Sequence, residues 1–334
     1  MMLLNLSSPF MLTAILASIA LMIVNGWTDA PVNIAAAIHS KAITPKAAVL
    51  LAAVFNLLGA AAMCFWGNKI AVSIYSISGL ATQGKSALPS LTAAFSAVVV
   101  WALAALRFGI PTSESHSLAA ALSGAAVATA GFGTFNIAEW LKLLTGLVLS
   151  TLPIALLSFL AVKYTENFFK NYDSLQFKRM QILGAALSSF SHGAQDGQKF
   201  AGVLSLNIAL AQNNSSSVSV PLWATLVSAS FIALGTLLGG QKIIDRFEEF
   251  APTDPKAGFM SDLVSSIGLL FLSITGIPAS TTHAKSSAVM GAGAIGAKLK
   301  TVLKSANPLF AAWGLTFPVS AALGYLFAVV FLRV

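Results

Sequence analysis

The segment GIPTSESH at residues 109–116 decides the fold of this chain, because it returns as GIPASTTH at residues 276–283. The two segments stand 167 residues apart. A second pair, NGWTD at 25–29 and HGAQD at 192–196, has the same spacing. One such match could arise by chance, but two at an identical offset, accompanied by matching apolar runs, indicate a tandem duplication.

The chain is too apolar for a water-soluble protein. Of its 334 residues, 57% are hydrophobic and 9% are charged, and the mean hydropathy is +0.82. Runs such as 47–66 and 310–331 are long enough to cross a bilayer as helices. The single cysteine, Cys64, excludes a disulfide framework or a thiolate metal cluster. We therefore predict an all-α, multi-pass protein of a cell membrane, the cytoplasmic membrane of a prokaryote, with the lipid bilayer as its surroundings.

Basic residues predict that the repeats, residues 1–167 and 168–334, are threaded in opposite directions. The net charge of +8 collects in short loops, where it reports membrane orientation and not a nucleic-acid partner. Copy one has Lys41 and Lys46 after its first motif, whereas the matching connection of copy two has no basic residue. Cytoplasmic loops are enriched in Lys and Arg, so corresponding loops should lie on opposite sides. The predicted cytoplasmic loops are 41–46, 163–179 and 298–304, and the loop at 211–217 is predicted to be external.

Each repeat is predicted to contain a broken helix and a re-entrant hairpin with the GIP motif at its tip. In copy one the hairpin should enter through 89–108 and return through 117–131, and its counterpart covers 256–298. Irregular backbone is tolerated at membrane depth only where protein or water satisfies its amide groups. Pro111 and Pro278 can each start the returning helix, and the hydroxyl groups behind them can cap it or face a ligand. Two tips meeting near the midplane would offer N–H groups to an anion, phosphate above others.

Two acids lie inside apolar helices, Asp29 in copy one and Asp196 in copy two. An intramembrane carboxylate is costly, so a functional role is its default interpretation. Inverted copies with interrupted helices are typical of secondary transporters. Two carboxylates beside phosphate would repel it in a low-dielectric site, so a cation should enter with the substrate. Nearby amide and carbonyl oxygens favour Na⁺ over H⁺. We expect a transporter and not an enzyme, with no catalytic residue and no cofactor.

The segments NGWTDAP, SHGAQDGQKFAG and the two GIPxSxxH motifs resemble those of the PiT inorganic phosphate transporter family over nearly the whole chain. The resemblance implies cation-coupled symport of phosphate, or of sulfate in some members. The chain departs from the family pattern around each acid. The Asn that precedes the acid in the family is Thr28 in the first motif and Gln195 in the second. Asn33 stands one place later than the family's Asn, and Glu114 stands where copy two has Thr281.

Carried over residue by residue, the resemblance implies a substrate site made of the two acids and the hairpin hydroxyls. These residues are Asp29, Ser113, Ser115, Asp196, Ser280, Thr281 and Thr282. The expected coupling-cation site comprises Asn25, Asp29, Asn33, Gln195 and Asp196, with Na⁺ placed at Asn25, Asp29 and Asp196. For His116, His192, His283 and Lys199 the sequence leaves both a functional and a purely structural role open.

We expect phosphate to be imported by alternating access, driven by the gradient of the cation. A sulfate permease of the same family is the nearest alternative, and a passive anion channel is a second. An intramembrane aspartyl protease shares two buried acids, but neither acid occurs in a Gly-x-Gly-Asp setting. The sequence leaves open whether the cation is Na⁺ or H⁺ and whether the protein forms a homo-oligomer.

Overall fold

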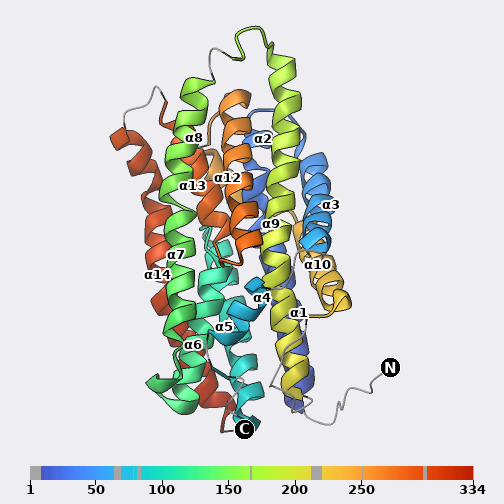
Figure 1. Cartoon of the computed structure of the whole chain (residues 1–334), viewed down its shortest axis with the longest axis vertical. Helices are drawn as coiled ribbons and strands as arrows, with labels where there is room; N and C mark the ends of the chain where they lie inside the picture. Colours follow the sequence, from blue (N-terminus) through green and yellow to red (C-terminus); the bar gives the residue numbers. More distant parts are fainter. Residues whose placement is uncertain are drawn as a thin grey trace.

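The structure is a computed structural model that describes residues 9–63, 69–77, 79–80, 84–165, 168–211, 220–249, 251–295 and 299–333. In these ranges the chain forms helices and no strands (Figure 1). The helices of copy one are α1 (Pro9–Thr28), α2 (Ala35–His39), α3 (Pro45–Met63), α4 (Lys69–Ser76), α5 (Ala87–Arg107), α6 (Glu114–Ala130), α7 (Ile137–Leu149) and α8 (Leu152–Tyr164). Those of copy two are α9 (Ser174–Ala211), α10 (Leu222–Thr236), α11 (Gln241–Glu248), α12 (Pro255–Thr275), α13 (Thr281–Gly293) and α14 (Leu299–Phe331).

Six segments of the described ranges are long and apolar enough to cross a membrane. They are Met11–Asn33, Pro45–Met63, Ala87–Arg107, Ile137–Tyr164, Pro255–Thr275 and Leu309–Phe331. The consecutive helices α10 and α11 form a further candidate, bent by 69° at the break between them. These segments confirm a multi-pass membrane protein.

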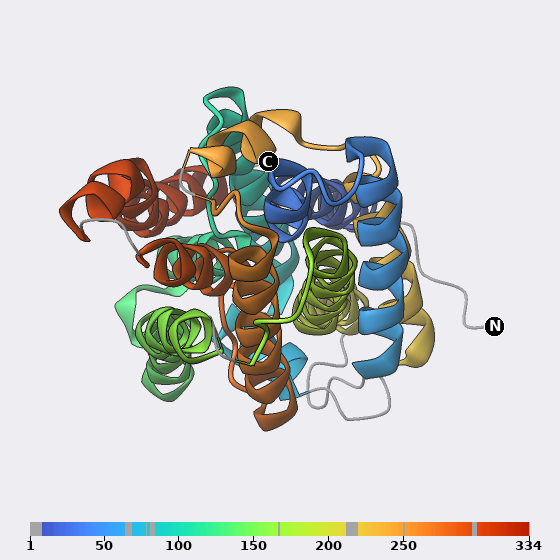
Figure 2. The ribbon, with the colours of Figure 1, turned by 90° about the horizontal axis from the view of Figure 1, so that it is seen from above.

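The two copies interlock instead of standing side by side. Helix α1 packs against α10, and α9 packs against α3. A Cβ added to Gly26 would lie 2.0 Å from the carbonyl oxygen of Ile232, and one added to Gly193 would lie 2.0 Å from that of Asn56. Glycine therefore brings each pair of backbones into direct contact. Figure 2 shows α9 near the centre of the bundle, where it packs against α3, α10 and α12.

Both predicted hairpins are present. Helices α5 and α6 form one, in the lower half of Figure 1, and α12 and α13 form the other, in the upper half. The tips meet between them, because the imidazole rings of His116 and His283 have centroids 4.7 Å apart. The hairpins thus approach the centre from opposite ends. The side of the membrane that each end faces stays a prediction, as does the repeat boundary at 167/168.

The helix that carries the acid is interrupted in copy one and continuous in copy two. Helix α1 ends at Thr28 and the chain continues as a short 3₁₀-helix, Ala30–Asn33, whereas α9 runs without a break through Asp196. The difference follows from one residue. Pro31 has no N–H and its ring clashes with the preceding turn, but the equivalent position in copy two is Gln198, which continues a helix.

Some predicted features lie outside the described residues. These are Cys64, residues 166–167 of the predicted cytoplasmic loop at 163–179, residues 212–217 of the predicted external loop and residue 298 of the last predicted cytoplasmic loop.

Candidate functional site

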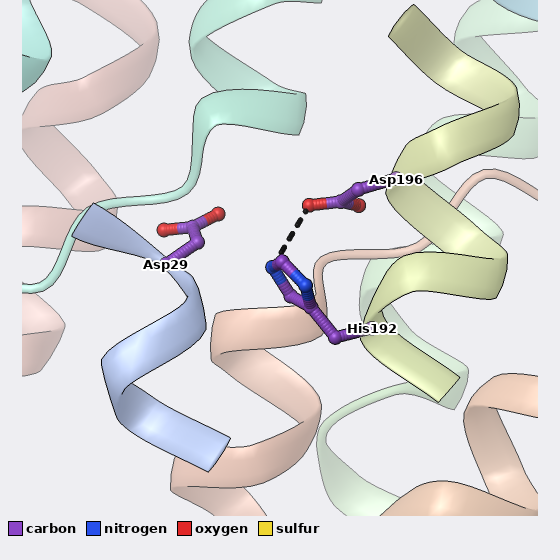
Figure 3. Close-up of side chains that lie close together, drawn as sticks. All are labelled: Asp29, His192 and Asp196. Atoms are coloured by element: carbon purple, nitrogen blue, oxygen red, sulfur yellow. Dashed lines mark ion pairs between the residues drawn. The ribbon is translucent and has the colours of Figure 1, made fainter. Parts of the chain in front are cut away.

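Asp29 and Asp196 come together at the centre of the bundle. Asp29 follows the last residue of α1 and is 2% exposed, and Asp196 lies midway along α9 and is 0% exposed. The amide nitrogen of Asn25 donates to both carboxyl groups, at 3.4 Å from Asp29 Oδ2 and 3.1 Å from Asp196 Oδ2. Figure 3 shows the two carboxyl groups pointing into a common space beside the ring of His192. The two equivalent acids therefore lie together, as expected, and their roles in binding stay predictions.

Asp196 is surrounded by polar and basic side chains. The ammonium group of Lys199 lies 2.7 Å from its Oδ1, and His192 Nε2 lies 3.3 Å from its Oδ2. The hydroxyl of Thr281 donates to Oδ2 at 3.4 Å. Asn25 and His192, which occupy equivalent positions in the two motifs, thus both contact the carboxylate of copy two. All of these groups are buried.

Asp29 has a different environment, because its neighbour is a second acid. The carboxyl groups of Asp29 and Glu114 are close enough for their charges to interact, and Thr282 lies near the same Asp29 carboxyl. The hydroxyl of Thr28 donates to Glu114 Oε1 at 2.5 Å. Glu114 is 0% exposed and is the first residue of α6, where the positive end of the helix favours an acid. The two symmetry-related acids are therefore electrostatically unlike.

The hairpin tips bring two helix N-termini to this centre. Gly109 and Gly276 adopt φ angles of 64° and 80°, a left-handed conformation that lets the chain turn before each Pro. Ser113 caps α6 by accepting a hydrogen bond from the backbone N–H of His116, and Ser280 caps α13 in the same way through His283. The predicted caps are confirmed. The roles of Ser113 and Ser280 in substrate binding stay predictions.

Lys199 joins both tips to α9. Its ammonium group donates to Ser115 Oγ at 2.6 Å, to Asp196 Oδ1 at 2.7 Å and to the carbonyl oxygen of Ala279 at 2.6 Å. Ser115 belongs to the first turn of α6, and Ala279 precedes α13. An ammonium group has three N–H donors, and here all three have partners.

Two of the expected cation ligands point elsewhere. Asn33 Oδ1 accepts from Ser188 at 2.9 Å, and its amide nitrogen donates to the carbonyl oxygen of Ala30. Gln195 accepts from Ser273 at 2.5 Å and donates to the carbonyl oxygens of Ile277 and Ala279. These contacts brace the helix break of copy one and the hairpin tip of copy two. None of these hydrogen bonds reaches Asp29 or Asp196. The cation role expected of Asn33 and Gln195 stays a prediction.

The histidines separate into two groups. His192 contacts Asp196 and holds Asn56 Oδ1 at 3.0 Å through Nδ1. His116 and His283 face each other behind the tips, and neither ring has a hydrogen-bond partner among the described residues. His283 stacks on Trp313 with centroids 3.9 Å apart, and His116 lies against Phe317. His192 therefore belongs to the acid centre, whereas the other two pack the tips against α14.

Sequence reasoning overlooked several polar residues as parts of buried clusters. Glu114 appeared only as a departure from the family pattern, although an acid inside a membrane hairpin carries the same signal as Asp29. Asn56 is buried within the long apolar stretch of α3 and could have been found by the same argument. A further buried ion pair joins Asp262 of α12 to Lys285 of α13, with Gln181 donating to Asp262 at 2.5 Å.

The centre contains the kind of ligand atom, oxygen, that a hard cation prefers. Ligand atoms of Asp29, His192 and Asp196 lie within 4.8 Å of one another. Asn25 Oδ1 and Glu114 Oε2 are buried and accept no hydrogen bond from the described residues. Oxygen atoms in this state can bind Na⁺, which takes carboxylate and amide oxygens as ligands.

Comparison with known proteins gives a consistent result. Residues 25–176 and 163–324 each match the phosphate transporter family. The chain is 31% identical over 315 residues to a probable low-affinity inorganic phosphate transporter of Bacillus subtilis, covering 93% of both chains. It is 30% identical over 334 residues to a protein of the same description from Rhizobium meliloti, covering 96% of both.

One solved structure, described as the sodium-dependent phosphate transporter, has the same fold. It superposes with a TM-score of 0.84 over 98% of this chain and 100% of the other, at 21% sequence identity. The two family matches within one chain confirm the two repeats inferred from the motifs.

Proposed function

Because the chain belongs to the phosphate transporter family, we propose that it imports inorganic phosphate together with a coupling cation. The observation that carries this proposal is the buried meeting point of both hairpin tips with Asp29 and Asp196. Hydroxyl groups, two helix N-termini and an ammonium group converge there beside three carboxyl groups. Such a centre can hold an anion and a cation together.

The donors suit an oxyanion. Ser115, Thr281 and Thr282 lie in the first turns of α6 and α13, where backbone N–H groups lack helical partners and the helix dipole favours negative charge. A phosphate oxygen can replace Asp196 as the acceptor of the Thr281 hydroxyl, and it can replace Ser115 as the acceptor of the Lys199 ammonium. The hairpin hydroxyls are thus proposed as the substrate contacts.

The acids favour phosphate over sulfate. At neutral pH phosphate retains at least one P–OH group, which donates a hydrogen bond, whereas sulfate has only acceptor oxygens. An ionised carboxylate is only an acceptor. Asp29 and Glu114, which lie near each other at the tips, can therefore accept a hydrogen bond from phosphate that sulfate cannot donate.

A cation must accompany the anion, because three carboxyl groups and phosphate in one dry site repel one another strongly. We propose Na⁺, held by Asn25 Oδ1 and the carboxyl group of Asp29, since Asn25 Oδ1 is buried without a hydrogen-bond partner among the described residues. A proton on an acid is the alternative.

The closed state of the site supports alternating access. Asn25, Asp29, Glu114, Asp196 and Lys199 are all between 0% and 2% exposed. Solutes can enter only if helices separate. The hairpins approach the centre from opposite ends, so parting one at a time would open the site to one side at a time (Figure 1). A passive channel would need a continuous open path.

The proposal is tested by uptake into proteoliposomes of radiolabelled phosphate or sulfate, under an imposed Na⁺ or proton gradient. We expect phosphate to accumulate against its gradient when Na⁺ drives it, with sulfate far less. Equal accumulation of sulfate would support the sulfate permease instead. Downhill flux that persists after all ion gradients collapse would indicate a channel, and accumulation driven by protons alone would remove Na⁺ from the proposal.

A further inference from the structure

The two symmetry-related acids are neutralised in different ways. Asp196 has the Lys199 ammonium at 2.7 Å, and His192 and Asn25 complete its surroundings. Asp29 is in no ion pair among the described residues, and its carboxyl interacts with that of Glu114. One acid of the centre therefore has a resident countercharge and the other does not.

The difference is built into the sequence and breaks the symmetry of the repeat. The position equivalent to Lys199 in copy one is Val32, and the position equivalent to Glu114 in copy two is Thr281. Copy two thus supplies the base at its own acid, whereas copy one supplies a second acid. Lys199 adds one positive charge beside Asp196, and Glu114 adds one negative charge beside Asp29. Together these two differences between the copies shift the negative charge of the centre toward Asp29.

We propose that the Lys199 ammonium is a built-in cation for Asp196, an inference that rests on the proposed function. The mobile coupling cation then binds only on the side of the centre that contains Asp29 and Glu114. The ammonium group occupies the place that a bound cation would need. Its three ligands are oxygen atoms, from Ser115, Asp196 and the carbonyl of Ala279, at 2.6 to 2.7 Å.

The tether gives this cation a property that a free ion lacks. Lys199 is covalently part of α9 and cannot be released to either side, so it balances Asp196 in every state of the transport cycle. The opposite flank has free oxygen atoms at Glu114 Oε2 and Asn25 Oδ1, which are buried without a hydrogen bond among the described residues. The side of the centre that contains Asp29 and Glu114 therefore needs a mobile cation and has oxygen atoms that can bind it.

The consequence is a lower number of coupling cations than two independent acids would require. Removal of the ammonium should create a demand for a further mobile cation at Asp196. Removal of the ammonium and the acid together should leave the balance unchanged. The ratio of net charge to phosphate moved therefore measures the role of Lys199, whichever cation the protein uses.

The experiment compares purified wild type with Lys199→Gln, Asp196→Asn and the double variant Lys199→Gln/Asp196→Asn in proteoliposomes. The reversal potential of phosphate transport gives the charge moved per phosphate. Lys142→Gln is the matched control, because Lys142 is an exposed lysine that also pairs with an acid three residues away. We expect Lys199→Gln to move one more positive charge per phosphate and the double variant to return to the wild-type ratio.

An inactive Lys199→Gln protein still decides the question. If the double variant then transports phosphate, charge balance is the role of Lys199. A double variant as inactive as the single one, or a Lys199→Gln protein with the wild-type ratio, would overturn the inference. Wild-type vesicles that fail to accumulate phosphate at all would instead reject the proposed function, so the two failures are distinguishable.

Discussion

His116 and His283 stand at equivalent positions in the two repeats, and the centroids of their imidazole rings lie 4.7 Å apart. The contact fixes the two hairpin tips face to face. Each histidine donates its backbone N–H to the serine three residues before it, so the caps and the ring contact are parts of one local structure. The centre formed there leads to the following predictions.

Each cap serine should have a stability role that can be separated from substrate binding. Ser113→Ala should reduce the free energy of unfolding by about 1 kcal/mol, the usual cost of losing an N-cap, whereas Ser113→Gly should cost only a few tenths. If the hydroxyl also binds phosphate, both variants should weaken binding by about 1 to 3 kcal/mol. Thermal unfolding and phosphate titration of the purified proteins check the two effects. Wild-type affinity in the glycine variant would restrict Ser113 to capping.

Neutralising Asp29 should abolish phosphate accumulation and leave a folded protein. Asp29→Asn keeps the size of the side chain but removes the charge that holds the coupling cation. Glu114→Gln should weaken cation dependence in the same direction, because its carboxyl lies against Asp29. Uptake under an imposed gradient measures both, with elution on gel filtration as the control for folding. Normal accumulation in both variants would contradict the assignment of the cation to this flank.

Close glycine contacts should be intolerant of even one methyl group. A Cβ on Gly193 would meet the carbonyl oxygen of Asn56 at 2.0 Å, so Gly193→Ala must push α9 away from α3. We expect a loss of about 1 to 3 kcal/mol of stability, the range for overpacked cores. Gly314→Ala is the control, since nothing lies within 4 Å of the added Cβ. Similar thermal midpoints for the two variants would refute this packing argument.

The buried pair of Asp262 and Lys285 should be replaceable by apolar residues. Asp262→Asn leaves a buried ammonium without its acid, and we expect it to cost about 3 to 5 kcal/mol. Copy one has apolar side chains at the equivalent positions. Phe95 corresponds to Asp262, Leu118 to Lys285 and Ala14 to Gln181. The triple variant carrying these residues should be more stable than Asp262→Asn in thermal unfolding. The reverse order would show that the charges themselves stabilise the hairpin.

The orientation of the chain can be tested with reporters in the loops. Sites at 41–46, 163–179 and 298–304 should be protected from an external thiol reagent, and a site at 211–217 should be accessible in intact cells. Cysteines introduced singly into a variant without Cys64 provide the readout. A site near 41–46 and one near 211–217 reacting from the same side would overturn the inverted threading.

The sequence by itself determined the helical class, the two repeats, the hairpins and the pairing of Asp29 with Asp196. These features follow from hydropathy, from the constant offset of two motifs and from the cost of an acid in a membrane. Each of these signals can be read from residues near one another in the chain, or from copies compared at one spacing. The N-caps at Ser113 and Ser280 could be predicted for the same reason.

Only the tertiary structure decided which side chains share the centre. Asn25 reaches both acids and Lys199 reaches both hairpin tips, whereas Asn33 and Gln195 form hydrogen bonds that brace the backbone around them. The glycines of α9 also bring its backbone into direct contact with that of α3. Contacts of this kind join residues that are at least 78 positions apart, and they depend on the distance between packed backbones. A linear sequence of one chain contains no measure of that distance.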